Sequence, residues 1–318
     1  VQSIGEAAFY YDYNINSIVL PESLTSIGAT AFYGNFGLRS INIPKNVTSI
    51  GENAFEFMQV AEVYNYSDLI IEQGATENGY LGYFSEVIYN ADDLKDEVPE
   101  SKIQAIDGIK YYVNGDDFIA LSPVTKTGSL RQNVTNVVLD ERTTAIANYA
   151  FYYCEDLSDI TIPNTVKSIG DRALSRCNFT SVVIPEGVEY LGSALFNVNN
   201  NLVQVSVPNS VTTMADGVFM NCPNLKVVNL PEGMTEIPAR TFNGAGIETF
   251  TFSENIETVG TSAFWSCTKL ETIIVDSAAI YKSLTSNSAC GFILNWGANT
   301  VKVLASIVDN PENTNNWL

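Results

Sequence analysis

A unit of about 23 residues recurs along this chain and constrains its fold more than any other feature. One copy runs from Leu38 to Phe55, and its apolar side chains recur at fixed offsets around Pro44 and Gly51. A second copy, from Leu157 to Leu174, has the same spacing. Further copies are marked by a proline, or by a residue that replaces it within a largely preserved apolar frame: Pro21, Pro185, Pro208, Pro231, Asp140, Ser253 and Asp276. One such unit cannot bury its apolar face alone, so the repeat predicts a solenoid of stacked coils.

Within a unit, the order of residue types predicts three short segments. The Leu-x-x-Ile-x-Ile run alternates apolar and polar residues at its end, which is typical of a strand with one buried face. The proline ends this strand, because it has no amide to donate to a parallel ladder. A second extended piece follows, and a single helical or irregular turn then places a phenylalanine such as Phe55 in the core. We therefore expect a β-rich α/β solenoid with a long parallel sheet and a ladder of phenylalanines.

The repeat lapses at residues 60–90 and 272–307, and each lapse places a glycine–aromatic loop before one more strand. We interpret both as degenerate terminal units, because the last coil of a solenoid otherwise exposes its core and an unpaired strand edge. The acidic run at 92–97 reads as a solvated connector, and Asn114-Gly115 between two β-rich runs predicts a hairpin. The expected organisation is a first array at 1–92, a connector and hairpin at 93–133, and a second array at 134–318.

The chain starts inside a unit, since Ile4-Gly5 and Ala8-Phe9 match only the second half of the pattern. We expect the natural protein to begin upstream of Val1, and an export signal to have been removed with that part. No stretch approaches the roughly 18 apolar residues of a membrane helix, so no membrane insertion is expected in this segment. The net charge of −20 opposes binding to nucleic acid and to anionic membranes.

Four of the five cysteines occupy one repeat position, which other units fill with small or medium side chains. These cysteines are Cys154, Cys177, Cys222 and Cys267, and their counterparts are Asn35, Met58, Asn199 and Ala245. We interpret the position as interior and its cysteines as small hydrophobic residues. Cys154 and Cys177 lie on adjacent coils, and the sequence leaves open whether that pair is bridged.

The composition argues against an enzyme. The chain has no histidine, which excludes Ser-His-Asp and Cys-His nucleophiles and histidine-containing zinc sites. Paired carboxylates can hydrolyse glycosides without histidine, but the acidic residues are dispersed and no pair stands out. The acids at 92–97 and at 116–117 do not match a calcium loop, and a connector and a hairpin turn explain them better. We predict no catalytic residue, no cofactor and no metal site.

Two surfaces are candidates for binding. The first is the outward face of the main strands, which solenoids commonly use and which is almost uncharged here: Ser40, Asn42, Asp159, Thr161, Gln204, Ser206, Asn229, Thr249 and Thr251. The second is an edge of aromatic residues beside the core phenylalanines: Tyr10, Tyr11, Tyr13, Tyr33, Tyr152, Tyr153 and Trp265. Each has a plainer explanation, because small polar residues suit an exposed sheet and tyrosines can be partly buried between coils.

The combined pattern Leu-x-x-Ile-x-Ile-Pro-x-x-Val-x-x-Ile-Gly-x-x-Ala-Phe-x-x-Cys resembles the BspA-type leucine-rich repeats, most cleanly over Leu157 to Cys177. The resemblance implies a leucine-rich repeat solenoid on an exported, cell-surface protein of host-associated bacteria. It also implies a non-catalytic adhesin that recognises a protein or glycoprotein ligand, such as host extracellular matrix or a partner cell. The alternative is a structural spacer that presents another domain at the cell surface.

Overall fold

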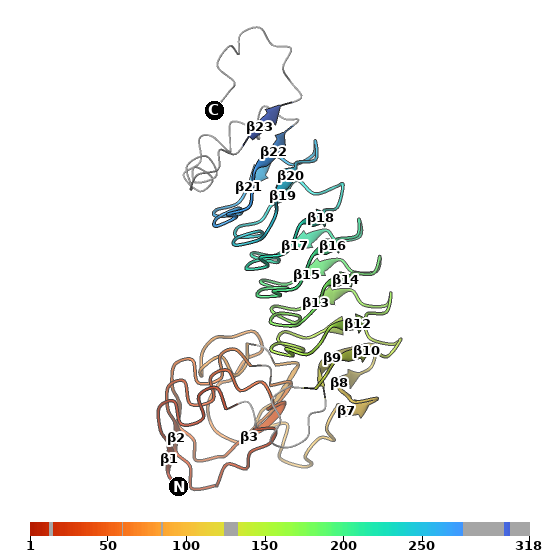
Figure 1. Ribbon diagram of the computed structural model, residues 1–318. Coiled ribbons are helices and arrows are strands. Elements are labelled where there is room, and N and C mark those ends of the chain that lie inside the picture. Colours follow the sequence, from red (N-terminus) through yellow and green to blue (C-terminus); the bar gives the residue numbers. More distant parts are fainter. Residues whose placement is uncertain (13–14, 59, 84, 124–132, 276–301, 306–318) are drawn as a thin grey trace. The chain divides into compact units, whose positions relative to one another are not determined.

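The computed structural model describes the chain except for residues 13–14, 59, 84, 124–132, 276–301 and 306–318. The chain divides into two compact units. Unit 1 comprises residues 1–132 with 143–151, and unit 2 comprises residues 133–142 with 152–318. Both consist of coils in which a main strand, a shorter second strand and a turn follow one another, as Figure 1 shows. The described residues contain strands and turns but no helix, so the irregular form of the predicted turn is the one observed.

Unit 1 contains two parallel sheets, one from each strand series. The main strands pair in the order β3 (Ser40–Ile43), β5 (Glu62–Asn65) and β6 (Val87–Tyr89). The second strands pair in the order β1 (Ser3–Ile4), β2 (Ser26–Ile27) and β4 (Ser49–Ile50). Along β3 the inward isoleucines are buried and the outward residues are exposed, as the alternation predicts. The strand predicted within the first lapse is confirmed as β6.

The predicted hairpin is also confirmed, and a further strand precedes it. β8 (Ile109–Asn114) and β9 (Asp117–Pro123) are antiparallel and meet at the Asn114–Asp117 pair, with Gly115 at φ 63° in the turn. β7 (Ile103–Ile106) pairs antiparallel with β8. β9 also pairs parallel with β11 (Ala145–Ile146), so the hairpin continues the second-strand series.

The main strands of unit 2 form three separate hydrogen-bonded groups. β10 (Asn136–Val138) pairs with β12 (Asp159–Thr161). β14 (Ser181–Val183), β16 (Gln204–Ser206) and β18 (Val227–Asn229) form a second group, and β20 (Thr249–Thr251), β22 (Thr272–Val275) and β23 (Lys302–Ala305) form a third. The second strands are β13 (Ser168–Ile169), β15 (Tyr190–Leu191) and β17 (Thr213–Met214), followed by β19 (Glu236–Ile237) and β21 (Thr258–Val259). The strand predicted near 301–304 is therefore present as β23, while most of the predicted C-terminal cap lies outside the described residues.

The ladder interruptions in unit 2 follow the repeat length. From β10 to β22, consecutive main strands are 23 residues apart where they pair, but 22 apart at β12–β14 and β18–β20, where the ladder is interrupted. The missing residue comes just before the strand, where Cys177-x-Phe179 replaces the usual longer spacing seen in Cys154-x-x-Leu157. In unit 1 the 22-residue step from β3 to β5 keeps its pairing, so a short step alone does not break the ladder. At both interruptions in unit 2 the second strands remain paired, β13 with β15 and β19 with β21.

In the turn that carries the phenylalanine, successive backbone amides donate alternately to the next coil and to the same turn. The amide of Phe9 donates to the carbonyl of Ala31 in the next coil, at 2.8 Å. The following amide, of Tyr10, donates back to Ala7 at 3.2 Å. Most turns hold two residues at positive φ, four positions apart. The first of each pair is Ala7, Thr30, Asn53, Tyr149, Arg172, Ala194, Gly217, Arg240 or Ser262, and the second is Tyr11, Gly34, Phe57, Tyr153, Arg176, Val198, Asn221, Gly244 or Ser266. Because a helix needs consecutive right-handed residues, this backbone cannot be one.

The predicted ladder of phenylalanines is confirmed in both units. Phe32 stacks on Phe9 and Phe55 at 5.1 and 5.2 Å between ring centroids, and Phe219 stacks on Phe196 and Phe242 at 5.8 and 5.7 Å. Each of these rings except Phe9 is almost fully buried. Offset stacking at such distances adds about 0.5–1.5 kcal/mol per pair beyond burial.

The cysteine position is interior, as predicted, and its side chains donate hydrogen bonds. The Cys222 thiol donates to the Phe196 carbonyl at 3.1 Å, and the Asn199 amide donates to the Leu174 carbonyl at 2.8 Å. Each acceptor lies in the preceding coil. The thiols of the four described cysteines are free, so Cys154 and Cys177 are not bridged. Burial raises the pKa of Cys222 to about 12.

Candidate binding surface

The main-strand face of unit 2 is open. Its strands show an exposed–buried–exposed pattern, apart from the half-buried centre of β18, so two outward residues per strand face solvent. The register aligns Ser181, Gln204 and Val227 in one column, and Val183, Ser206 and Asn229 in the other. All the outward residues predicted from the sequence are exposed: Ser40 and Asn42 in unit 1, and Asp159, Thr161, Gln204, Ser206, Asn229, Thr249 and Thr251 in unit 2.

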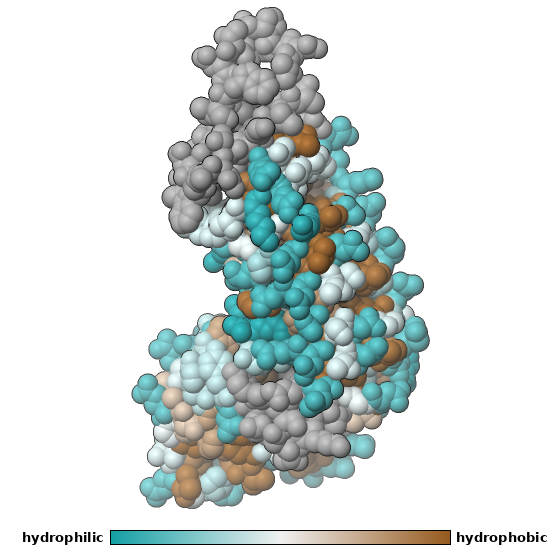
Figure 2. Space-filling view, in the orientation of Figure 1, coloured by the Kyte–Doolittle hydropathy of each residue, from teal (hydrophilic) through white to brown (hydrophobic). Residues whose placement is uncertain are grey.

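A groove of about 620 Å³ lies over β14, β16 and β18. Its lining includes Val183, Gln204, Ser206 and Asn229, together with Glu186 from the turn after β14. Val183 is 80% exposed, so most of its apolar surface is available for contact with a partner. Figure 2 shows apolar patches interspersed with hydrophilic side chains along unit 2. We call this concavity the central groove.

A second groove, of about 600 Å³, lies at the interruption between β18 and β20. Its floor includes core residues such as Ile237 and Phe250, and its walls include Thr249 and Thr251. The ion pair between Lys226 Nζ and Glu248 Oε1, at 3.0 Å, crosses the interruption at the rim. The predicted residues of β20 therefore belong to a different groove from those of β16.

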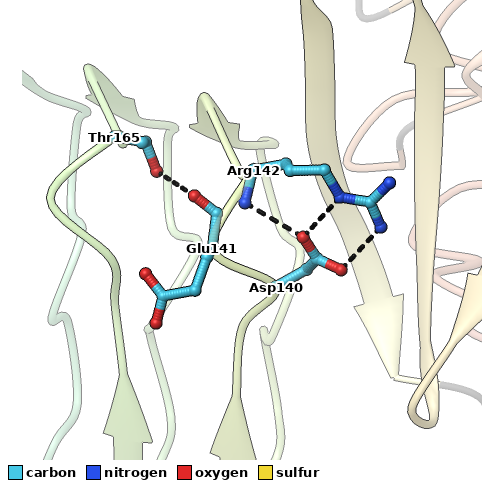
Figure 3. A network of polar contacts seen from close by, with 4 residues as sticks. All are labelled: Asp140, Glu141, Arg142 and Thr165. Atoms are coloured by element: carbon cyan, nitrogen blue, oxygen red, sulfur yellow. Dashed lines mark hydrogen bonds and ion pairs between the residues drawn. The ribbon is translucent and has the colours of Figure 1, made fainter.

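The turns that follow the main strands form an acidic edge along the face. The exposed glutamates of this edge are Glu141, Glu186, Glu232 and Glu254. Next to Glu141, Arg142 donates from Nε and from its second guanidinium nitrogen to the two carboxylate oxygens of Asp140, at 2.8 and 2.7 Å (Figure 3). These bonds, with a bond from the Arg142 amide, lower the pKa of Asp140 to about 2. Thr165 lies in the next coil, and its hydroxyl donates a hydrogen bond back to the Glu141 carbonyl at 2.8 Å.

The predicted tyrosine edge separates into clusters. In unit 1, Tyr10 stacks on Tyr33 at 5.0 Å between centroids, and Tyr11 meets Tyr33 edge-on at 5.4 Å. Tyr10 is 48% exposed, while Tyr11 and Tyr33 are half-buried. Burial and the neighbouring Tyr11 raise the pKa of Tyr33. Tyr13 lies outside the described residues.

In unit 2, Tyr152 and Tyr153 lie 6.0 Å apart, and the Arg176 guanidinium lies 5.4 Å from the Tyr153 ring centroid. Trp265 belongs to the same unit, on a coil more than 100 residues further along the chain. All three side chains are half-buried. Partial burial between coils was the alternative to ligand binding that their positions in the sequence allowed. The cation–π contact holds adjacent coils together, so it already gives Tyr153 a structural role.

Unit 1 contains a covered counterpart of the open face, which the sequence reasoning missed. Glu62 and Tyr64 occupy the outward positions of β5, in register with Ser40 and Asn42, yet both are buried. The Glu62 carboxylate accepts hydrogen bonds from the Tyr64 hydroxyl at 3.2 Å, from the Ser101 hydroxyl at 2.8 Å and from the Lys102 amide. Large residues at two outward positions, where other coils have small ones, were the signal available in the sequence.

The aromatic side chains beside Glu62 complete this cover. Tyr64 stacks on Tyr89 at 5.2 Å between centroids. Tyr112, from the hairpin, is also buried and interacts electrostatically with Tyr89. Burial raises the pKa of all three phenols, and the Glu62 carboxylate adds to that effect. The segment at 101–102 and the hairpin therefore occupy the face that is open in unit 2.

A metal site requires several acidic or cysteine side chains that converge on one ion. Within the described residues, no group of three or more Cys, Asp or Glu side chains converges closely enough to hold an ion. Nor does the described part of the chain contain a helix with the length and apolar character needed to cross a bilayer.

The model of the BspA-type leucine-rich repeat region matches residues 1–79, 130–245 and 199–290, which together exceed half of the chain. This chain belongs to the BspA-type leucine-rich repeat family. The BspA-type chain gave no match among curated proteins.

Three solved structures are similar to this BspA-type chain to different extents. The pneumococcal vaccine antigen PcpA is 16% identical over 97% of this chain and 72% of its own, with a TM-score of 0.51. A leucine-rich cell surface protein from Faecalibacterium prausnitzii is 20% identical over 100% of this chain and 86% of its own, with a TM-score of 0.35. The leucine-rich repeat protein of T. pallidum is 22% identical over 52% of this chain and 90% of its own, with a TM-score of 0.44. At these identities the PcpA similarity shows the solenoid fold alone.

Proposed function

We propose that this protein is a non-catalytic adhesin, displayed outside a bacterial cell, that recognises a macromolecule with the open strand face of unit 2. The observation that carries the proposal is the central groove, where exposed polar side chains surround a strongly exposed valine. Burying that valine against a partner is favourable by about 25 cal/mol per Å² of apolar surface. Small polar neighbours can form hydrogen bonds with the same partner.

Membership of the BspA-type family supports display at a cell surface, and one fold neighbour, PcpA, is a pneumococcal vaccine antigen. The absence of histidine from the sequence and the dispersal of the acidic side chains support a role without catalysis. Protein or glycoprotein ligands, including components of the host extracellular matrix, are the proposed partners.

The test is a binding panel with immobilised fibronectin, fibrinogen, laminin, collagen and mucin glycans at physiological salt. The decisive variant carries Val183→Arg and Ser206→Arg, which fill the central groove with long cationic side chains. Its matched control carries Thr213→Arg and Thr258→Arg, which add the same charge at exposed second-strand positions. Saturable binding that only the groove variant loses supports the proposal. Equal binding by both variants contradicts a role for the open face.

The tyrosine edge is a second candidate contact on the same protein. Tyr10 offers an exposed ring above Tyr33, as aromatic platforms for proteins and sugars do. Tyr-to-Ala changes at Tyr11, Tyr33 and Tyr153 are expected to weaken binding severalfold if this edge contributes. Unchanged binding, with an unchanged melting temperature, removes the tyrosines from the proposed site.

The rival function is a structural spacer, favoured by the absence of aromatic and arginine anchors from the described outward positions of β10 to β20. A spacer predicts no saturable binding to any member of the panel. It also predicts an outcome for a fusion in which a binding domain is attached to one end of this chain. Cells that display the fusion should attach equally well whether the chain is the parent or the groove variant.

A further inference from the structure

We propose that the central groove takes an extended polypeptide segment that carries lysine or arginine side chains beside small, β-branched ones. This inference rests on the proposed function and deepens it by naming the chemistry of the partner. It depends on three features of unit 2: the acidic edge, the spacing of the coils and the apolar content of the groove.

The charged side chain in the lining of the central groove is acidic. The outward residues of β14, β16 and β18 are uncharged, and Glu186 brings a carboxylate into the lining of the groove. The nearest cations are engaged within the protein, since Arg142 binds Asp140 and Lys226 binds Glu248. A cationic partner would therefore meet the carboxylates of the edge with little competition, and an anionic one would be repelled.

The geometry of the edge suits a chain that crosses the coils. Coils in a parallel sheet lie about 4.8 Å apart, so Glu186 and Glu232, two coils apart, are separated by roughly 10 Å. Glu254 follows one coil further along. Alternate side chains of an extended chain are about 6.7 Å apart, which the flexible stem of lysine or arginine can match to these carboxylates.

The floor of the groove selects for small apolar contacts. Val183 is 80% exposed and Val227 is 50% exposed, and both line the groove. Small β-branched side chains of a partner can bury these valines without a deep pocket. The described outward residues of β14 to β18 include no aromatic ring for stacking a sugar or a base, which favours polypeptide over glycan and single-stranded nucleic acid.

The probe is a synthetic fluorescent peptide that alternates lysine with valine and threonine and is long enough to cross four coils. We expect saturable binding by fluorescence anisotropy at low salt, weaker at physiological ionic strength, about 0.15 M. The same peptide with glutamate in place of lysine is expected not to bind. A chitin oligosaccharide serves as the glycan probe, and its binding in the groove in preference to the basic peptide overturns the inference.

Two matched variants separate the edge from the net charge of −20. The edge variant carries Glu186→Gln and Glu232→Gln, and the control carries Glu236→Gln and Glu257→Gln, which are exposed glutamates in or next to second strands. We expect the edge variant to weaken peptide binding about fivefold at low salt, and the control by less than about twofold. Equal losses in both variants would mean only long-range attraction and would overturn the inference.

The Val183→Arg, Ser206→Arg variant distinguishes failure of this inference from failure of the proposed function. If the basic peptide does not bind, but a panel ligand binds and is lost in that variant, the cationic partner is wrong and the adhesin proposal stands. If neither the peptide nor any panel ligand depends on the groove, both proposals fail together.

Discussion

The outward positions of one main strand are buried in unit 1, while those of an equivalent strand are exposed in unit 2. On β5 of unit 1 the outward residues Glu62 and Tyr64 are buried beneath residues 101–102 and the hairpin, whereas on β16 of unit 2 the outward residues Gln204 and Ser206 face solvent. Both strands sit within parallel ladders of three strands. The backbone does not decide which face is open; the outward side chains do. A buried carboxylate needs donors to compensate its lost hydration, while small neutral residues can remain in water.

The largest expected effect comes from removing the acceptor that holds the cover. Glu62→Ala leaves the Tyr64 and Ser101 hydroxyls and the Lys102 amide without that carboxylate, so we expect unit 1 to lose about 3 kcal/mol of unfolding free energy. Hydrogen exchange at residues 101–114 and urea unfolding measure the loss. The register-matched control, Gln204→Ala on the open face, is expected to stay within about 0.5 kcal/mol. Equal losses at the two positions would break the comparison.

Alkaline pH should weaken the covered face of unit 1 next. Burial raises the pKa of Tyr64, Tyr89 and Tyr112 above the ordinary value of 10. The folded state therefore holds these protons more tightly than the unfolded state does, and that contribution to stability is present below pH 10 and lost as the pH rises above it. Tyrosinate absorbance, with hydrogen exchange at 101–114, should show the cover over Glu62 opening as the pH rises. Tyr64→Phe is expected to reduce this pH dependence, and an unchanged profile in that variant would contradict the assignment.

A smaller effect tests the turn backbone beneath the open face. Gly217 and Ala194 hold the same turn position in adjacent coils, at φ 67° and 53°. A Cβ at Gly217 would lie 3.6 Å from Met220, an ordinary contact, so Gly217→Ala should cost about 1 kcal/mol through backbone conformation alone. Ala194→Gly is expected to gain about 0.5–1 kcal/mol for the same reason. Thermal unfolding measures the change in unfolding free energy for both variants. If both are destabilised, the residue preference at this position does not come from its backbone φ.

The smallest effect is expected from the ion pair at the start of unit 2. Because Arg142 lowers the pKa of Asp140 to about 2, the pair contributes stability above the ordinary pKa of 3.8, and this is lost as the pH falls through about 2. Asp140→Asn should cost less than about 1 kcal/mol at neutral pH, since Arg142 is largely exposed. The difference between parent and variant should disappear below pH 2, and a difference that persists there would point to packing and not charge.

The repeat allowed the coils, the inward residues and the phenylalanine ladder to be predicted, because one apolar period specifies all three. The hairpin followed from Asn114-Gly115, since Gly115 readily adopts the positive φ that the turn requires. The turn before the cysteine position was less predictable, since left-handed residues such as Val198 and Arg172 carry no local sequence signal. Their conformation is held by bonds to the next coil.

The outward positions were predictable, but their grouping was not. Sequence spacing places Gln204 and Thr249 in equivalent positions, yet Gln204 lines the central groove and Thr249 lines the groove at the β18–β20 interruption. Nor does spacing reveal the cover over Glu62, because its partner Ser101 is 39 residues away along the chain. Contacts of that range depend on tertiary structure and not on the repeat.

The staggered ladder interruptions have a mechanical consequence. At the β12–β14 and β18–β20 boundaries the main-strand ladder stops while the second-strand ladder continues, and at β17–β19 the second-strand ladder stops while β16 and β18 remain paired. The interruptions of the two ladders fall at different coil boundaries, so none of these boundaries loses both ladders at once. A pulling force along the stack of coils would therefore meet at least one intact strand ladder at each of these boundaries.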